Sequence, residues 1–581
     1  MTKFYSNEKT AQVVVALLKE HGIRKVIASP GTTNMSFVGS VQNDPYFEVY
    51  SSVDERSAAY LACGMAAESG EPVVISCTGA TASRNYMSGL TEAFYRKLPV
   101  LAITATKDIS SVGHHMAQVI DRSALPNDVV RHSVTLPIIK DNDDDLWDCE
   151  IKTNRAILEL VRHGGGPVHI NLPTTYNPSF GTKELPKVRV IDRITPTGEF
   201  PVMPKGKVAV FIGAHTAMSK EETDAIDSFC ASNNAVVFCD HTSGYKGKFR
   251  VLFALVASQR MLDLSPYQPD VLIHIGEITG DYYSIGMRGN QVWRVSEDGE
   301  IRDLYHKLRY VFEMTEKTFF GHYSQNDNAE QSSYFQTCKE KLGEIRGKLR
   351  DMPFSNIWIA SKLAHRIPEG SVVHLGILNS LRAWNFFELP ESVTSASNVG
   401  GFGIDGGVSS LIGASLSDKK KLYFGVIGDL AFFYDMNVIG NRHVGKNVRI
   451  LLVNNGKGTE FRNFSHPGAR FGNDADKYIA AGGHFGNKSK TLVKNYSQNL
   501  GFEYLTASNK QEFEEVYERF LTAEVTERPI LFEVFTDDAK ESDALSAITA
   551  IETSKKSEAK QFVKHLLGEK GVSALKKTLG R

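Results

Sequence analysis

The feature that most constrains the fold is a series of short apolar runs that alternate with helix-like stretches along the whole chain. The runs are continuous, without alternating polar residues, and many are followed by Gly, Thr, Pro or Asp. Parallel strands covered by helices on both faces have this character, because neither face meets water. The runs are KVIASPG, PVVISCTG, PVLAITAT, GPVHINLP, KVAVFIGAH, AVVFCDHTSG, PDVLIHIGEITGD, SVVHLGILNS, KLYFGVIGD, VRILLVNNG and RPILFEVFTD. The pattern predicts an α/β fold of doubly wound parallel sheets.

The spacing of these runs predicts several domains. At 581 residues the chain exceeds what one hydrophobic core supports. The runs fall into three blocks, at residues 1–185, 190–345 and 354–540, separated by proline-rich or charged polar segments. After them we expect a helical C-terminal tail over residues 541–581. We therefore expect three α/β domains followed by the tail.

The composition has no feature of a nucleic-acid-binding or membrane protein. The net charge is −1, so no surface-wide field attracts polyanions or anionic lipids. No apolar run approaches the roughly 20 residues that span a bilayer. The six cysteines are scattered without a CxxC pair, which is typical of buried thiols in a reducing compartment. We expect a cytoplasmic protein that binds neither nucleic acid nor membrane.

Two of the predicted strands end in side chains that can hold a metal ion. One run leads directly into Gly428 and Asp429, and another ends in Asn454 and Asn455. Ligands of open parallel sheets bind beyond the carboxyl ends of the strands. A carboxylate and an amide oxygen are suited to Mg²⁺, which usually completes its coordination with substrate phosphates and water. Taken alone, the same residues also fit a helix N-cap and a turn.

These residues are part of a wider resemblance. GDLAFFYDMN followed by VNNG resembles the diphosphate motif of thiamine diphosphate (ThDP)-dependent enzymes of the 2-oxoacid decarboxylase and acetolactate synthase superfamily. Further matching motifs follow in the same order: SPGTTN, VDERSAAYLACGMAAESGEPVVISCTGATASRNY, GPVHINLP and NVGGFGIDGGVSSLIGAS. The likeness covers nearly the whole chain apart from the tail. It implies a pyrimidine-binding (PYR) domain, a central domain and a diphosphate-binding (PP) domain.

Within this family the motifs are most similar to the menaquinone-pathway SEPHCHC synthases, because GDL replaces the commoner GDG. That branch joins a ThDP-bound succinyl semialdehyde unit, derived from 2-oxoglutarate, to isochorismate. The resemblance implies that Asp429, Asn455 and the main-chain carbonyl of Lys457 bind Mg²⁺. It also implies that Gly428 lets the backbone approach the diphosphate, and that amides from Leu430 onward donate to it at a helix N-terminus.

The resemblance also assigns residues to the rings of the cofactor. Glu55 matches the glutamate that hydrogen-bonds the pyrimidine nitrogen and so promotes removal of the thiazolium proton, which is acid–base work done through the cofactor. Ile404 matches the bulky residue that wedges between the two rings and orients them. Without the resemblance, Glu55 would be interpreted as a capping or ion-pair residue at the start of a helix, and Ile404 as a residue of the hydrophobic core.

A second group of candidates concerns the reaction itself. His114 and His115 fall where decarboxylase-type relatives carry a histidine pair, and Gln118 falls where synthase-type relatives carry a glutamine that faces the substrate. Histidines can relay protons or bind a carboxylate near neutral pH. The pair fits equally well as histidines of the surface or the core.

The substrate-binding residues of the SEPHCHC branch are only partly present. The arginine of its SPGSRN motif is Thr33 here, and the arginine of its NSLVVR-type segment is displaced to Arg382. Losing a charged partner for a dianionic substrate costs about 2–5 kcal/mol per pair, which disfavours isochorismate as the acceptor. Candidate partners for an acidic substrate in the loop 456–472, which fits a solvated lid equally well, are Arg462, His466 and Arg470.

We expect no FAD, because KVAVFIGAH offers one glycine where a dinucleotide fingerprint requires GxGxxG.

The favoured function is a ThDP- and Mg²⁺-dependent carboligase, which decarboxylates a 2-oxoacid to an enamine and joins it to a carbonyl or alkene acceptor. The alternatives are a simple 2-oxoacid decarboxylase, a SEPHCHC synthase with a divergent pocket, and a ThDP-binding protein without activity. In this family the PYR domain of one subunit faces the PP domain of another, which implies a homodimer or a dimer of dimers.

Overall fold

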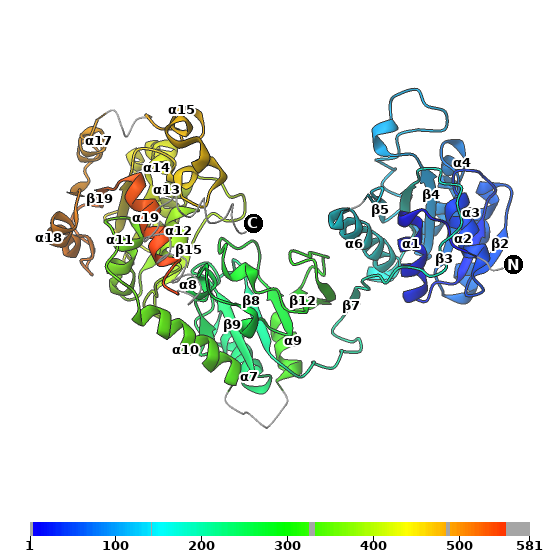
Figure 1. Ribbon diagram of the computed structural model, residues 1–581, viewed down its shortest axis with the longest axis horizontal. Helices are drawn as coiled ribbons and strands as arrows, with labels where there is room; N and C mark the ends of the chain where they lie inside the picture. The colour runs from blue at the N-terminus through cyan, green and yellow to red at the C-terminus, as the bar shows by residue number, and fades with distance from the viewer. Residues whose placement is uncertain (1–3, 141, 325–331, 484–488, 553–581) are drawn as a thin grey trace, which may run out of the picture. The chain divides into compact units, whose positions relative to one another are not determined.

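The computed structural model describes residues 4–140, 142–324, 332–483 and 489–552 (Figure 1). The chain forms two compact units. The first consists of Met1–Glu199 with Asp298–Glu313, and the second of Phe200–Glu297 with Met314–Arg581. Residues 553–581, most of the predicted helical tail, lie outside the described residues.

The first unit is built on a six-stranded parallel sheet. The strand order is β2-β1-β3-β4-β6-β5. The strands are β1 (Lys25–Ala28), β2 (Glu48–Ser51), β3 (Val73–Cys77), β4 (Val100–Thr106), β5 (His132–Thr135) and β6 (Val168–Pro173). In the same unit, β7 (Asp192–Ile194) pairs in parallel with β13 (Leu308–Glu313). The helices are α1 (Lys9–Glu20), α2 (Met35–Asn43), α3 (Glu55–Ser69), α4 (Thr81–Asn85), α5 (Met87–Arg96) and α6 (Asp143–Glu159).

Helices cover both faces of this sheet, which explains why its strands are apolar throughout. Val26 and Val74 pack into a core with α1, α2 and α6. Their neighbours Ile27 and Ile75 point the other way, into a second core with α3 and α5. Because successive strand residues face opposite sides, both sides must be apolar when both are buried.

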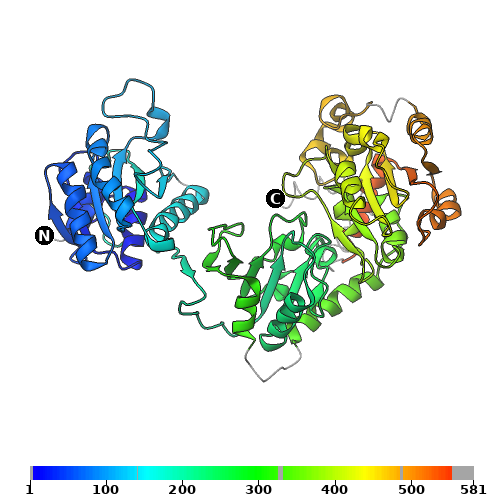
Figure 2. The same ribbon diagram turned by 180° about the vertical axis from the view of Figure 1, so that it is seen from behind.

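The second unit contains two further parallel sheets (Figure 2). One has the order β10-β9-β8-β11-β12 and the other β15-β14-β16-β17-β19-β18. The first is formed by β8 (Val208–Ile212), β9 (Ala235–Cys239), β10 (Arg250–Val251), β11 (Val271–Ile275) and β12 (Gln291–Ser296). The second is formed by β14 (Val372–Leu375), β15 (Thr394–Ala396), β16 (Tyr423–Gly428), β17 (Val448–Asn454), β18 (Glu503–Ala507) and β19 (Ile530–Phe535).

The helices of the second unit alternate with these strands along the chain. Those of its first half are α7 (Lys220–Ser232), α8 (Ala254–Ala257), α9 (Glu316–Tyr323) and α10 (Ser333–Gly347). Those around the last sheet are α11 (Asn356–Leu363), α12 (Asn379–Trp384), α13 (Gly407–Ser415), α14 (Asp429–Asp435), α15 (Ala475–Tyr478), α17 (Leu492–Asn499), α18 (Lys510–Phe520) and α19 (Asp538–Ile548). The predicted α/β fold with three parallel sheets is confirmed, whereas the domain boundaries inferred from the sequence stay a prediction.

Two smaller expectations can be compared with the structure. All six cysteines are free and buried, as the sequence predicts. None of the described helices is both long and apolar enough to cross a bilayer.

Candidate active site

Asp429 and Asn455 are brought together by two neighbouring parallel strands. β16 and β17 pair in a register that sets Gly428 opposite Val453, so both strands end at the same edge of the sheet. The Asp429 carboxylate accepts hydrogen bonds from two backbone amides, that of Leu430 at 2.9 Å and that of Gly456 at 2.6 Å. The Gly456 bond fastens the turn after β17 to the first residue of α14.

The two asparagines of this turn have different partners. Asn454 is buried and donates its amide to Glu533 of β19 at 2.7 Å, so it points into the sheet. Asn455 donates its side-chain nitrogen to Thr459 Oγ1 at 3.3 Å. The Oδ1 atom of Asn455 is buried and has no hydrogen-bond partner among the described residues. An acceptor oxygen in this state is suited to a cation, because its desolvation is otherwise uncompensated.

Asp429 is held in an environment that disfavours its charged form. The residue is 4% exposed. Burial raises the pKa of its carboxyl group to about 7, and the hydrogen bonds from Leu430 and Gly456 offset only part of this effect. A bound divalent cation reverses such a shift, because it stabilises the carboxylate directly.

These atoms form a donor set that fits Mg²⁺. The carbonyl of Lys457, the third expected ligand, accepts one hydrogen bond, from the Thr459 amide at 3.0 Å, and retains a second lone pair. A carboxylate, an unpartnered amide oxygen and a backbone carbonyl are the hard oxygen ligands that Mg²⁺ prefers. The side chain of Lys457 is engaged elsewhere, with Asp476 and Asp538 at 2.8 and 3.3 Å.

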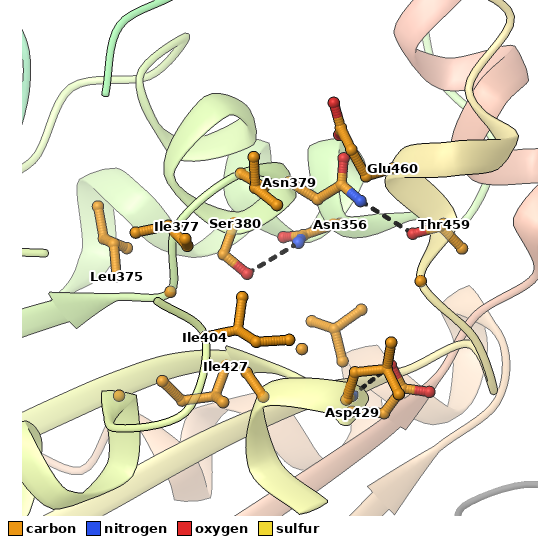
Figure 3. A pocket seen from close by; sticks show the side chains of 18 of the residues that line it. Asn356, Leu375, Ile377, Asn379, Ser380, Ile404, Ile427, Asp429, Thr459 and Glu460 are labelled. Carbon is orange, nitrogen blue, oxygen red and sulfur yellow. Dashed lines mark hydrogen bonds between the residues drawn. The ribbon is translucent and has the colours of Figure 1, made fainter. Parts of the chain in front are cut away.

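Asp429 and Asn455 open onto a pocket of about 260 Å³. This is close to the lower end of the roughly 300–1,000 Å³ of typical ligand sites. Ile404, from the loop before α13, points into the pocket (Figure 3). Gly428 also lines it, and a Cβ added there would meet no atom within 4 Å, so a side chain would project into open space. The amide of Leu430 is already bonded to Asp429.

Several lining residues were not singled out as functional by sequence reasoning. Asn379 donates to Thr459 Oγ1 at 2.9 Å, and Asn356 donates to Ser380 Oγ at 3.3 Å (Figure 3). Thr459 thus receives hydrogen bonds from both Asn379 and Asn455. The backbone is unusual directly before Asn379. Leu378 has a φ of 65°, which is uncommon for a residue other than glycine and is typical of functional segments. No sequence pattern marks Asn356, which is simply the first residue of α11.

Glu541 holds Asn356 in place from behind the pocket. Its carboxylate accepts the Asn356 amide at 3.0 and 3.1 Å and the Thr536 hydroxyl at 2.7 Å. Burial raises the pKa of Glu541 to about 7 from its ordinary 4.5. The folded protein therefore binds more protons at this group than the unfolded chain does between these two values.

This shift predicts that Glu541 makes stability fall as pH rises. The stabilisation that Glu541 contributes is fully present below pH 4.5 and is lost as the pH rises to about 7. We expect this loss to lower the free energy of unfolding by about 3 kcal/mol. Urea unfolding between pH 4.5 and 8 measures it. Glu541→Gln should remove this part of the pH dependence, whereas the exposed Glu515→Gln should leave the wild-type slope. Equal slopes for wild type and Glu541→Gln would contradict the prediction.

Arg382, expected to face an acidic substrate, is paired with an acid of its own chain. Its guanidinium forms two bonds of 2.8 Å with the carboxylate of Glu460, which lines the pocket. Both side chains are largely buried, at 11% and 17% exposure. Burial lowers the pKa of Arg382, but the hydrogen bond and charge of Glu460 outweigh this and raise it overall. The displaced arginine is thus neutralised beside the pocket.

We expect Glu460→Gln to lower the free energy of unfolding by about 3 kcal/mol, because it leaves a buried guanidinium without its carboxylate. Adding Arg382→Met should recover most of that loss, since the charge is then removed as well. Urea unfolding of the single and double variants measures both effects. Asp351→Asn, which removes an exposed ion pair with Lys510, should change stability by less than about 1 kcal/mol. Additive losses in the double variant would show that the two residues are not coupled.

The other expected substrate residues lie in the loop after the expected metal ligands. Arg462 pairs with Asp476 and Asp538, each at 3.3 Å. His466 accepts the Gly468 amide through Nδ1 at 2.9 Å. Arg470 is exposed, lies 5.0 Å from the centre of the Phe471 ring and has no acidic partner among the described residues. Of the two arginines, only Arg470 has no acidic partner in the described part of the chain.

The remaining expected residues belong to the first unit. Glu55 is the first residue of α3 and is half-buried, with Asn85 donating to its carboxylate at 3.4 Å. His114, His115 and Gln118 are exposed in the loop after β4. Thr33 is buried before α2, and its hydroxyl has no partner among the described residues. These residues are grouped at the carboxyl-terminal side of strands β1, β2 and β4, where ligands of parallel sheets bind.

Comparisons with known proteins agree with this arrangement. Residues 8–125 match the family described as "Thiamine pyrophosphate enzyme, N-terminal TPP binding domain". The chain is 31% identical over 563 residues to the 2-succinyl-5-enolpyruvyl-6-hydroxy-3-cyclohexene-1-carboxylate (SEPHCHC) synthase of Phocaeicola vulgatus, covering 93% of this chain and 98% of that relative. It is 30% identical to the proteins of the same name from Bacteroides fragilis and Bacteroides thetaiotaomicron, with the same coverage.

Proposed function

Because the chain belongs to the thiamine pyrophosphate enzymes, we propose that it is a ThDP- and Mg²⁺-dependent carboligase that acts on a 2-oxoacid donor. The observation that carries the proposal is the oxygen set of Asp429 and Asn455 at adjacent strand ends, open to a pocket that also contains Ile404. The unpartnered Oδ1 of Asn455 supports a cation at this point.

The residues of the second unit would hold the cofactor. Asp429, Asn455 and the Lys457 carbonyl bind the metal ion, and Gly428 leaves room for the diphosphate beside the backbone. When bound, ThDP supplies an electron sink for the electron pair that is released as a 2-oxoacid loses CO₂. Ile404, which lines the pocket, would contact the rings of the cofactor and so favour one relative orientation of them.

Glu55 would transfer the proton that this chemistry requires. Its carboxyl group holds and returns a proton at the pyrimidine ring nitrogen, which is general acid–base catalysis by a side chain outside the metal site. His114 and His115 would exchange protons with the bound substrate, and Gln118 would donate a hydrogen bond to it. For the carboxylate of an acidic substrate, Arg470 is the candidate of the second unit without an acidic partner among its described residues.

We propose that the active unit is at least a homodimer, in which Glu55 of one protomer serves the metal site of its partner. Exposed apolar side chains around the start of α3 support this arrangement. Val53 is 78% exposed, and Tyr60 and Leu61 are about half exposed. Such a patch is typical of a surface that a partner covers. Sedimentation at working concentration should show a dimer or tetramer, and a monomer that retains full activity would contradict the proposal.

The printed name of the relatives favours one second candidate, a SEPHCHC synthase. Thr33 and the Arg382–Glu460 pair argue against it, because both remove charge that a dianionic acceptor would need. Turnover of isochorismate with 2-oxoglutarate would establish this candidate, and no turnover would exclude it.

The experiment that tests the proposed function is a product assay of the purified protein with ThDP and Mg²⁺. Pyruvate and 2-oxoglutarate serve as donors, each with and without an aldehyde acceptor. We expect release of CO₂ together with a ligated product that depends on the acceptor. Release of CO₂ with only the free aldehyde as product would make the protein a decarboxylase. No CO₂ from either donor, while ThDP still binds, would contradict this donor class.

A further inference from the structure

The side-chain amide of Asn455 has one hydrogen-bond partner among the described residues, and that partner is Thr459. Asn455 Nδ2 donates to Thr459 Oγ1 at 3.3 Å, while Asn455 Oδ1 is left without a partner there. Both residues line the pocket, and Thr459 is 4% exposed. A buried acceptor therefore holds the nitrogen end of this amide and leaves its oxygen end for another group.

The orientation of this amide decides whether Asn455 can bind a metal ion. The oxygen of an asparagine amide has lone pairs that can bind a cation, whereas its nitrogen carries two hydrogens and only donates. If the Asn455 amide turned over, a donor would take the place of the ligand atom. The productive orientation puts the nitrogen against Thr459, so it requires an acceptor at that position. Thr459 Oγ1 supplies this acceptor.

Thr459 is held in its accepting role by Asn379, the first residue of α12. Asn379 Nδ2 donates to Thr459 Oγ1 at 2.9 Å (Figure 3). Because an amide nitrogen only donates, the Thr459 oxygen must accept in this bond. A hydroxyl oxygen has two lone pairs, so it can accept from Asn379 and Asn455 at the same time. The bond to Asn379 thus keeps the Thr459 oxygen beside Asn455.

The Arg382–Glu460 pair fixes the direction of the Asn379 amide in turn. Arg382 Nη1 donates to Asn379 Oδ1 at 3.2 Å. Asn463 Nδ2 donates to the same oxygen at 3.1 Å and to the Glu460 carboxylate at 3.2 Å. A guanidinium only donates and a carboxylate only accepts, so neither amide can turn over without losing its bonds. Asn379 therefore presents its nitrogen to Thr459.

We infer that Thr459 is a positioning residue of the metal site, which holds the Asn455 amide with its oxygen toward the cation. Asn379 and the Arg382–Glu460 pair act through Thr459, as later members of the same chain of hydrogen bonds. The inference rests on the proposed function, because it takes Asn455 as a ligand of Mg²⁺. It also gives the buried ion pair beside the pocket a role that needs no substrate.

The test measures metal uptake rather than turnover. EDTA-stripped full-length protein is titrated with Mn²⁺ at saturating ThDP, since Mn²⁺ takes the same oxygen ligands as Mg²⁺. Electron paramagnetic resonance follows the free Mn²⁺ against a blank of ThDP alone. Thr459→Val keeps the shape of the side chain and removes the acceptor, so it should weaken Mn²⁺ affinity about 10- to 100-fold. Thr459→Ser retains the hydroxyl group and should stay close to the wild type.

A second background separates a positioning role from a structural one. Asn455→Asp supplies a carboxylate, which offers an oxygen at either end, so its orientation no longer depends on an acceptor at residue 459. In this background the further change Thr459→Val should cost little Mn²⁺ affinity. A residue that only stabilises the loop would give the same loss in both backgrounds. The control is Thr549→Val, which removes a buried hydroxyl bonded to the Leu545 carbonyl at 2.8 Å in the same unit and should keep wild-type affinity.

The outcomes distinguish this inference from the proposed function. Wild-type Mn²⁺ affinity in Thr459→Val would overturn the inference and leave the proposed function standing. Equal losses from Thr459→Val in the wild-type and Asn455→Asp backgrounds would also overturn it. If Thr459→Val does not fold, Thr459→Ala removes the same acceptor and is judged by the same results. No uptake of Mn²⁺ by the wild type would contradict the proposed metal site, and this inference with it.

Discussion

Asp429→Asn should abolish the Mg²⁺-dependent uptake of ThDP, with an affinity at least about 100-fold lower than that of the wild type. Changes to residues that only orient a metal ligand already cost about 10- to 100-fold in metal affinity, so loss of the ligand's charge costs more. The substitution keeps the size of the side chain but supplies a neutral amide in place of the carboxylate. Calorimetric titration of ThDP into the protein at saturating Mg²⁺ measures the change.

The buried aspartate at the other end of α14 gives a matched control. Asp435 accepts the amide and hydroxyl of Ser409, both at 2.6 Å, and does not line the pocket. Asp435→Asn should lower stability, because it weakens these two charge-assisted bonds, and should leave the uptake of ThDP unchanged below the unfolding transition. Wild-type uptake by Asp429→Asn would mean that the metal ion is held by other residues.

Glu55→Gln should lower turnover by about 100- to 10 000-fold while ThDP still binds. This is the range expected when a general acid–base group is replaced by an amide that cannot transfer a proton. Glu55 belongs to the first unit and the proposed metal ligands to the second, so we expect the two substitutions to have different effects. Asp429→Asn should prevent the binding of ThDP, whereas Glu55→Gln should allow binding but prevent activation of the cofactor. Initial rates of CO₂ release at saturating ThDP and Mg²⁺, together with the ThDP titration, measure this separation.

The control for Glu55→Gln is Glu71→Gln, which removes an exposed glutamate that pairs with Lys25 at 2.6 Å in the same unit. We expect it to keep wild-type turnover. Full activity in Glu55→Gln would end the assignment of Glu55 as the acid–base group, even if ThDP and Mg²⁺ bind as proposed.

The central strands of the first and last sheets could be predicted from the sequence, and the edge strands of these sheets could not. β3 and β17 are buried at every position, so their sequences are continuous apolar runs. β2, at the edge of the first sheet, is exposed at all four positions, and its sequence EVYS carries no such signal. β15 and β18 are the corresponding edges of the last sheet. An edge strand has one neighbour and fewer buried faces, so its composition is only weakly constrained.

The neighbouring positions of the two proposed metal ligands could be predicted for a related reason. Asp429 and Asn455 directly follow central strands, so the strand pattern alone sets them at one edge of the sheet. The Arg382–Glu460 pair was not predictable, because it joins α12 to a loop far along the chain and depends on tertiary packing. The same is true of Arg122. This arginine follows β4 in a polar loop, and only the structure shows that it is buried, with its Nη1 atom unpartnered among the described residues.

The most direct test of the account is a titration of the purified, EDTA-stripped protein with ThDP, with and without Mg²⁺. The account predicts saturable binding of one ThDP per chain that requires a divalent cation and is lost in Asp429→Asn. Absence of binding with Mg²⁺ and with every other divalent cation tried, in a protein that is folded by circular dichroism, would contradict it.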